Sequence, residues 1–133
     1  MRVLALDYGS ARCGVALSDP TGTLATPVAA VERPATKKGF ATLVAFVRER
    51  EVGRVVVGLP LGLSGRDTAQ TTETREFAER LEQALDVPVS LYDERFTTAI
   101  AERAGSRTTS EDSRAAAVLL DDWLARHGEE VRR

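Results

Sequence analysis

The chain has 133 residues, of which 43% are apolar and 29% charged, and its formal net charge is −2. This length supports one ordinary hydrophobic core but not two, and this composition is typical of a folded globular domain, which excludes a disordered chain. The slight negative charge provides no general attraction for a polyanion, so a nucleic-acid partner would have to be held by a local basic patch or through metal ions.

The N-terminal third predicts three strands in succession. Val3–Leu6 is a continuous apolar run, typical of a strand buried on both faces, and it ends at Asp7. After a turn at Gly9, Cys13–Leu17 is expected to form the second strand. Ala25–Val31 is expected to form the third, because the intervening letters DPTG are typical of a turn. Short connections favour an antiparallel meander.

The middle of the chain alternates helical and strand patterns. An amphipathic helix is predicted where apolar residues recur at helical spacing, at Phe40, Leu43, Val44 and Val47. The run RVVVGL at 54–59 predicts a fourth strand, and 71–85 returns to helical spacing. The letters VPVSLYDE at 87–94 predict a fifth strand, which ends in an acidic pair.

A last helix is expected to place one apolar face on the sheet. That face consists of Ala116, Leu119, Leu120 and Trp123. The charged tail at about 125–133 is expected to fray. The order βββ-α-β-α-β-α has no linker or repeat, so residues 1–133 are predicted to form a single α/β domain with a mixed five-stranded sheet.

The sequence also predicts the role of the cysteine and the cellular compartment of the protein. Cys13 is the single cysteine, so neither an internal disulfide nor a thiolate zinc site is expected, and it is interpreted as a small apolar strand residue. No leader pattern and no apolar run of roughly 18 residues is present. We therefore expect a cytoplasmic protein with no membrane partner.

Acidic residues end two of the predicted strands. In α/β sheets, ligands gather beyond the carboxyl ends of the strands, where Asp7 and the pair Asp93–Glu94 are expected to meet. Neighbouring carboxylates resist joint ionisation unless cations neutralise them, so this pattern favours a divalent metal, Mg²⁺ or Mn²⁺. A pair of such ions can support phosphodiester hydrolysis.

The glycines near the N-terminus do not form a phosphate-binding P-loop. Gly9 and Gly14 have the required spacing, but Val15 and Ala16 occupy the positions of the essential Lys and Ser/Thr. A strand also follows where that motif requires a helix.

Four ordered motifs resemble one family. They are LDYGSARCGVALSD, VVVGLPLGLSG followed by REFAERL, then YDERFTT, and finally DSRAAAVLLDDWL. Together they resemble YqgF-type proteins, a family of pre-16S rRNA nucleases that are also described as Holliday-junction-resolvase-like, over residues 3–124. The resemblance implies an RNase H-like fold and a metal-dependent nuclease that processes the 5′ end of pre-16S rRNA in ribosome biogenesis.

The resemblance implies a catalytic, metal-ligating trio of Asp7, Glu94 and Asp112. Each acid also has a structural alternative: Asp7 could close a turn, Glu94 could be a solvated charge, and Asp112 could complement the dipole of the helix that it begins. Glu111 and Asp121 are competing candidates near the third position.

Four further residues of the matched motifs are candidates for substrate binding. Arg12 and Arg95 could hold backbone phosphates or pair with the acids, and Thr97 and Thr98 could line the site or cap a helix. His127, the single histidine, is expected at the surface of the tail.

One segment departs from the family pattern. The stretch AIAERAGSRTTSE at 99–111 is short and contributes only Arg103 and Arg107, whereas the corresponding segment of the family is longer and more basic. A basic loop would bind phosphate groups whatever the nucleotide sequence. Its reduction in this chain is therefore expected to affect the affinity for the substrate and the type of substrate.

Two classes of function remain open at this point. The first is a nuclease acting on pre-rRNA, with ribosome association, or on branched DNA as a Holliday-junction resolvase. The second is a non-catalytic nucleic-acid or ribosome-associated binding module. Resolution of a four-way junction would favour a homodimer, whereas trimming of RNA ends works with a monomer.

Overall fold

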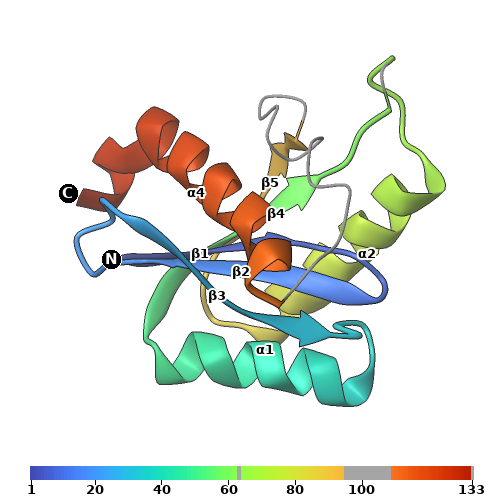
Figure 1. Ribbon diagram of the computed structural model, residues 1–133, viewed down its shortest axis with the longest axis horizontal. Helices are drawn as coiled ribbons and strands as arrows, with labels where there is room; N and C mark the ends of the chain where they lie inside the picture. The colour runs from blue at the N-terminus through green and yellow to red at the C-terminus, as the bar shows by residue number, and fades with distance from the viewer. Residues whose placement is uncertain (63, 95–108, 133) are drawn as a thin grey trace.

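A computed structural model describes residues 1–62, 64–94 and 109–132, with the backbone alone at 109–112 and 132 (Figure 1). The elements are β1 (Arg2–Asp7), β2 (Arg12–Ser18), β3 (Ala25–Glu32), α1 (Lys37–Glu49), β4 (Val52–Leu59), α2 (Ala69–Ala84), β5 (Val89–Asp93) and α4 (Thr109–Arg132). Within these residues, the predicted order of strands and helices is confirmed. No helix of the described part of the chain is long and apolar enough to cross a membrane.

The five strands form one mixed sheet in the order β3-β2-β1-β4-β5. β1, β2 and β3 pair antiparallel as the predicted meander, while β4 and β5 run parallel to β1. This arrangement confirms the predicted fold class. β1 is the central strand, which explains its apolar sequence, because a strand covered on both faces cannot alternate polar and apolar residues.

Helices cover both faces of the sheet (Figure 1). Alternate residues of β1 point to opposite faces: Leu4 and Leu6 pack in the core under α1 and α2, while Val3 and Ala5 pack in the core under α4. We call the second side the α4 face. Since strand side chains alternate, Asp7 continues the series of Val3 and Ala5 and belongs to the α4 face.

The charged tail does not fray, and this expectation was wrong. α4 continues to Arg132, and Val131 is only 4% exposed because it packs against Gly22 in the β2–β3 turn. His127 stacks on Trp123 with ring centroids 5.1 Å apart. Trp123, His127 and Val131 recur at steps of four residues, so the buried stripe of the helix continues through a stretch that is charged on its other sides.

Candidate active site at the carboxyl end of the sheet

Asp7 is a buried carboxyl group at the end of the central strand. It is 4% exposed, and its Oδ1 atom is shielded from solvent. The apolar strand before it forces this burial, because β1 lies between two other strands and under α4. A carboxylate in such a place is poorly hydrated and calls for compensating positive charge.

Glu94 directly follows β5 and lies on the same side of the sheet. A Cβ built on Gly58 would fall 2.7 Å from Glu94 Oε1 and 3.1 Å from Leu119 Cδ2 of α4, which places the Glu94 carboxyl between β4 and α4. Burial, and then the nearby charge of Asp93, raise the pKa of Glu94 to about 7. This position differs from the solvated charge considered from the sequence.

Strand pairing brings Asp7 and Glu94 to neighbouring positions. Leu6 pairs with Val57 in the parallel β1–β4 ladder, so Asp7 and Gly58 are the next residues along these two strands. Because the Glu94 carboxyl covers Gly58, the two acids converge on the α4 face at the carboxyl end of the sheet.

A hydrogen bond from β2 anchors the start of α4 at this end of the sheet. The β2–β3 register shifts between Cys13 and Val15, and here the Val15 N–H donates to Ser113 Oγ at 3.1 Å, inside the protein. Val15 and its neighbour Gly14 pair with Leu6 and Asp7 across the β1–β2 ladder. The first turn of α4 is therefore held beside the end of β1.

Asp112 precedes Ser113 in this anchored first turn of α4. The backbone thus brings the third predicted acid to the end of the sheet where the other two lie, although its side chain is outside the described part, as is that of Glu111. Asp121 is exposed and lies nine residues further along α4, roughly 13 Å away. It therefore does not belong to this group.

The remaining predicted site residues divide into two groups. Arg12 begins β2 at the same end of the sheet, is exposed, and lies opposite Glu32 in the β2–β3 ladder. Arg95, Thr97 and Thr98 lie outside the described residues.

The donor set fits a hard divalent cation. The buried carboxyl group of Asp7 and the half-buried one of Glu94 converge there, and oxygen ligands are those that Mg²⁺ and Mn²⁺ prefer. Burial and the charge of Asp93 raise the pKa of Glu94, and a cation bound beside it would favour its ionised form. Within the residues whose side chains are described, no group of three candidate ligands occurs, and the side chain of Asp112 is not among them.

Sequence reasoning missed two residues that shape this site. Gly58 provides the space for Glu94, and a glycine inside a buried β-branched strand was the available signal for a close approach. Ser113 supplies the anchor for α4. Its role depends on a register shift between two other strands, for which the sequence carries no visible signal.

The β4–α2 connection begins at the same end of the sheet. It is a folded loop: the Gly62 N–H donates to the Arg66 carbonyl at 2.9 Å and the Gly65 N–H donates to the Gly62 carbonyl at 2.8 Å. Gly65 has a φ of +81°, which favours glycine.

Comparisons with known proteins agree with this architecture. A family model described as "RuvX: Holliday junction resolvase" matches residues 1–126. A Maridesulfovibrio salexigens protein named "Putative pre-16S rRNA nuclease" is 40% identical over 134 residues, covering 95% of this chain and 99% of that protein. An Anaeromyxobacter sp. protein of the same name is 43% identical over 132 residues, covering 93% and 96%.

A solved structure shares the fold at low sequence identity. It is described as T. thermophilus RuvC in complex with Holliday junction substrate, and it aligns with a TM-score of 0.59 and 17% identity over 96% of this chain and 97% of that one. At this identity the likeness concerns the fold alone.

Proposed function

Because the chain belongs to the RuvX family, which is described as Holliday junction resolvase, we propose that it is a single-domain, metal-dependent nuclease that hydrolyses phosphodiester bonds in structured nucleic acid. Family membership confirms the resemblance of its four motifs to YqgF-type proteins. The names of its relatives describe nuclease activity. Its metal dependence and its site residues are inferred from the chain itself.

One observation carries the proposal. Asp7, from the end of β1, and Glu94, which follows β5, converge on the α4 face, where Gly58 leaves room for the Glu94 carboxyl. Two carboxyl groups withdrawn from water on the same face repel each other when both are ionised, and a bound divalent cation would offset this repulsion.

Asp7, Glu94 and Asp112 would hold one or two Mg²⁺ or Mn²⁺ ions. Bound there, such ions would activate water and offset the charge of the scissile phosphate. Asp7 contributes a carboxylate at the end of the central strand. The pKa of Glu94 is raised to about 7, and a bound cation would favour the ionised form of its carboxyl group. Arg12 and Arg95 would bind substrate phosphates with their planar guanidinium groups, and Thr97 and Thr98 would line the site.

We propose pre-16S rRNA as the substrate, cut at its 5′ end during ribosome assembly in the cytoplasm. Relatives that align over nearly their whole length carry that name. The second candidate is branched DNA, which the family description favours. A non-catalytic binding module is the third, and it predicts that nucleic-acid binding survives neutralisation of the acids while no cleavage is seen with the parent protein.

The test compares the two substrates side by side. End-labelled structured RNA and a four-way DNA junction are incubated with the protein in Mg²⁺, in Mn²⁺ or in EDTA, and the molar mass is measured by light scattering. We expect metal-dependent cleavage of the RNA by a monomer. Symmetric cleavage of the junction by a dimer would identify a resolvase instead, and binding of either substrate without cleavage in any metal would favour the binding module.

A further inference from the structure

Three exposed cations gather where β3 meets α1. Arg33 follows the last residue of β3, and Lys37 and Lys38 are the first two residues of α1. We call them the β3–α1 basic patch. Within the described part of the chain, none of the three forms an ion pair, and the acid that lines the same hollow as Arg33 and Lys38 is Glu32, which lies opposite Arg12 in the ladder. The patch is therefore a local excess of positive charge on a chain whose net charge is −2.

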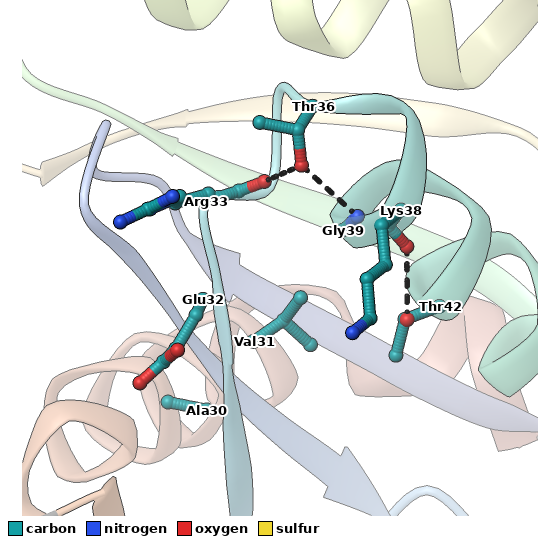
Figure 2. A pocket seen from close by; sticks show the side chains of 8 residues that line it. All are labelled: Ala30, Val31, Glu32, Arg33, Thr36, Lys38, Gly39 and Thr42. Atoms are coloured by element: carbon teal, nitrogen blue, oxygen red, sulfur yellow. Dashed lines mark hydrogen bonds between the residues drawn. The ribbon is translucent and has the colours of Figure 1, made fainter.

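Arg33 and Lys38 of the patch line a hollow large enough for a phosphate group and its neighbours. A cavity of about 590 Å³ lies between β3 and α1, lined by Ala30, Val31, Glu32, Arg33, Thr36, Lys38, Gly39 and Thr42. Figure 2 shows the Lys38 side chain extending from α1 beside Thr42, across from the β3 residues. Two of the patch cations thus line the cavity, together with two threonine hydroxyl groups.

Hydrogen bonds fix the backbone that carries these cations. Thr36 Oγ1 donates to the Arg33 carbonyl at 2.7 Å and accepts from the Gly39 N–H at 3.2 Å (Figure 2). A Cβ on Gly39 would fall 2.2 Å from the Arg33 carbonyl oxygen, so strand and helix meet in backbone contact. The Arg33 N–H donates to the Ala11 carbonyl at 2.9 Å, which ties the patch to the β1–β2 hairpin.

Stability does not explain the two lysines. The first turn of α1 contains no acidic residue, and cations at the N-terminus of a helix are disfavoured by its dipole. The lysines therefore occupy the end of the helix where they stabilise it least. A ligand of opposite charge would compensate for this.

The patch lies at the same end of the sheet as the candidate active site. β1 and β3 are both antiparallel to β2, so they run parallel to each other, and Arg33 follows β3 as Asp7 ends β1. Two strand spacings, roughly 10 Å, separate β1 from β3 in the sheet. Glu94 lies on the opposite side of β1, so a strand that runs from the acids toward β3 passes Arg12 at the start of β2 before it reaches the patch, which lies on the α1 side of the sheet.

We propose that the β3–α1 basic patch binds the phosphate backbone of the nucleic-acid substrate, on one side of the scissile phosphate and a few nucleotides from it. This inference rests on the proposed nuclease function and adds a second contact region to it. The patch supplies positive charge to a chain whose segment 99–111 contributes only Arg103 and Arg107. Such contacts position the substrate without reading its sequence.

The experiment measures binding and cleavage separately. Binding of a fluorescent structured RNA is followed by anisotropy across a salt titration, in an Asp7→Asn background that prevents turnover. The test variant carries Arg33→Gln and Lys38→Gln, both exposed, and its thermal unfolding is recorded. The control is Arg50→Gln, which removes an exposed charge from the other end of α1, roughly 20 Å away.

We expect the double variant to bind the RNA roughly tenfold more weakly at low salt, with a salt slope shallower by about 0.7–0.9 per cation removed. In the active background its KM rises while kcat stays within about twofold, because the patch does not touch the reacting phosphate. Shortening the RNA on one side of the cut should abolish the difference from the parent protein, and shortening it on the other side should not.

An affinity and a salt slope equal to those of the parent protein would overturn this inference and leave the nuclease proposal intact, provided that the parent cleaves. Failure of the parent protein to cleave in any metal is the separate result that overturns the nuclease proposal. A tenfold loss of binding in the Arg50→Gln control as well would show a general charge effect and would also overturn the inference.

Discussion

Gly58 of β4 lies beneath the carboxyl group of Glu94, so closely that a Cβ at position 58 would stand 2.7 Å from Glu94 Oε1. The same Cβ would stand 3.1 Å from Leu119 Cδ2 of α4, so a side chain at position 58 would meet both Glu94 and α4. The absence of a side chain at position 58 therefore sets the place of one of the proposed metal ligands.

Gly58→Ala should reduce nuclease activity more than its loss of folding stability alone would explain. The added methyl group displaces Glu94, so we expect cleavage to fall roughly 10- to 100-fold, with a loss of about 1–3 kcal/mol in the free energy of unfolding. The control is Gly53→Ala in the same strand, where the three atoms nearest to the added Cβ all belong to the side chain of the exposed Met1. Equal activity of the two variants would contradict the assignment of Glu94.

Ser113→Ala should loosen the start of α4. It leaves the buried Val15 N–H without its Ser113 acceptor, and a lost partner of this kind costs about 1–3 kcal/mol. Urea denaturation measures this loss, and cleavage should fall with it because Asp112 precedes Ser113. Thr42→Ala removes an exposed hydroxyl bonded to the Lys38 carbonyl and should change stability by less than about 0.5 kcal/mol.

Val131→Ala tests the ordered end of α4. Val131 is 4% exposed and packs on Gly22, so its truncation should lower the free energy of unfolding by roughly 1–3 kcal/mol. Glu129→Ala alters an exposed residue of the same turn and should have little effect. If both substitutions are neutral by urea denaturation, the end of α4 does not contribute to the core.

Asp19 should make the β2–β3 turn sensitive to acid. Its carboxylate accepts a hydrogen bond from the Thr21 hydroxyl and bonds from the backbone N–H groups of Leu24, at 2.9 Å, and Thr23, at 2.7 Å. These bonds, that of Thr21 first, hold the pKa of Asp19 below its ordinary value. An acid with a lowered pKa stabilises the folded state above its unfolded-state pKa, near pH 4, and this stabilisation is lost as the pH falls further.

Asp19→Asn should therefore lower the melting temperature at pH 6 and differ progressively less from the parent protein as the pH falls from about 4 to 2. Thermal unfolding at a series of pH values measures this, with the exposed Asp86→Asn as the control. A difference between parent and Asp19→Asn that stays constant with pH would show that the charge of Asp19 is not involved.

Much of the fold could be predicted because its apolar patterns are unambiguous. Val3–Leu6 is apolar throughout since β1 is covered on both faces, and the spacing of Leu119, Leu120 and Trp123 identified the buried side of α4. The end of α4 could not be predicted in the same way. His127 and Val131 continue the packed side of the helix, but they are only two residues in a charged stretch, so no apolar pattern is visible there in the sequence.

The candidate site was predictable in part. Acids at strand ends indicated Asp7 and Glu94, because strand direction alone brings such residues to one end of the sheet. The burial of Glu94 was not predictable, since it depends on α4 closing over Gly58. The basic patch was missed because Arg33 and Lys38 come together through the packing of α1 on β3, and no motif in the sequence marks this.

The assignment of the active site is tested most directly by measuring metal-dependent cleavage by Asp7→Asn and Glu94→Gln. Each is compared with the parent protein and with Asp121→Asn, which neutralises an exposed acid of α4. Structured RNA and a four-way DNA junction serve as substrates in Mg²⁺ and Mn²⁺. We predict that both site variants lose roughly 100-fold or more of the cleavage rate, since even the partners behind metal ligands contribute 10- to 100-fold. They should keep or improve nucleic-acid binding, and Asp121→Asn should cleave like the parent. Cleavage by Asp7→Asn and Glu94→Gln at the parent rate would contradict the proposal that these two carboxyl groups form the active site.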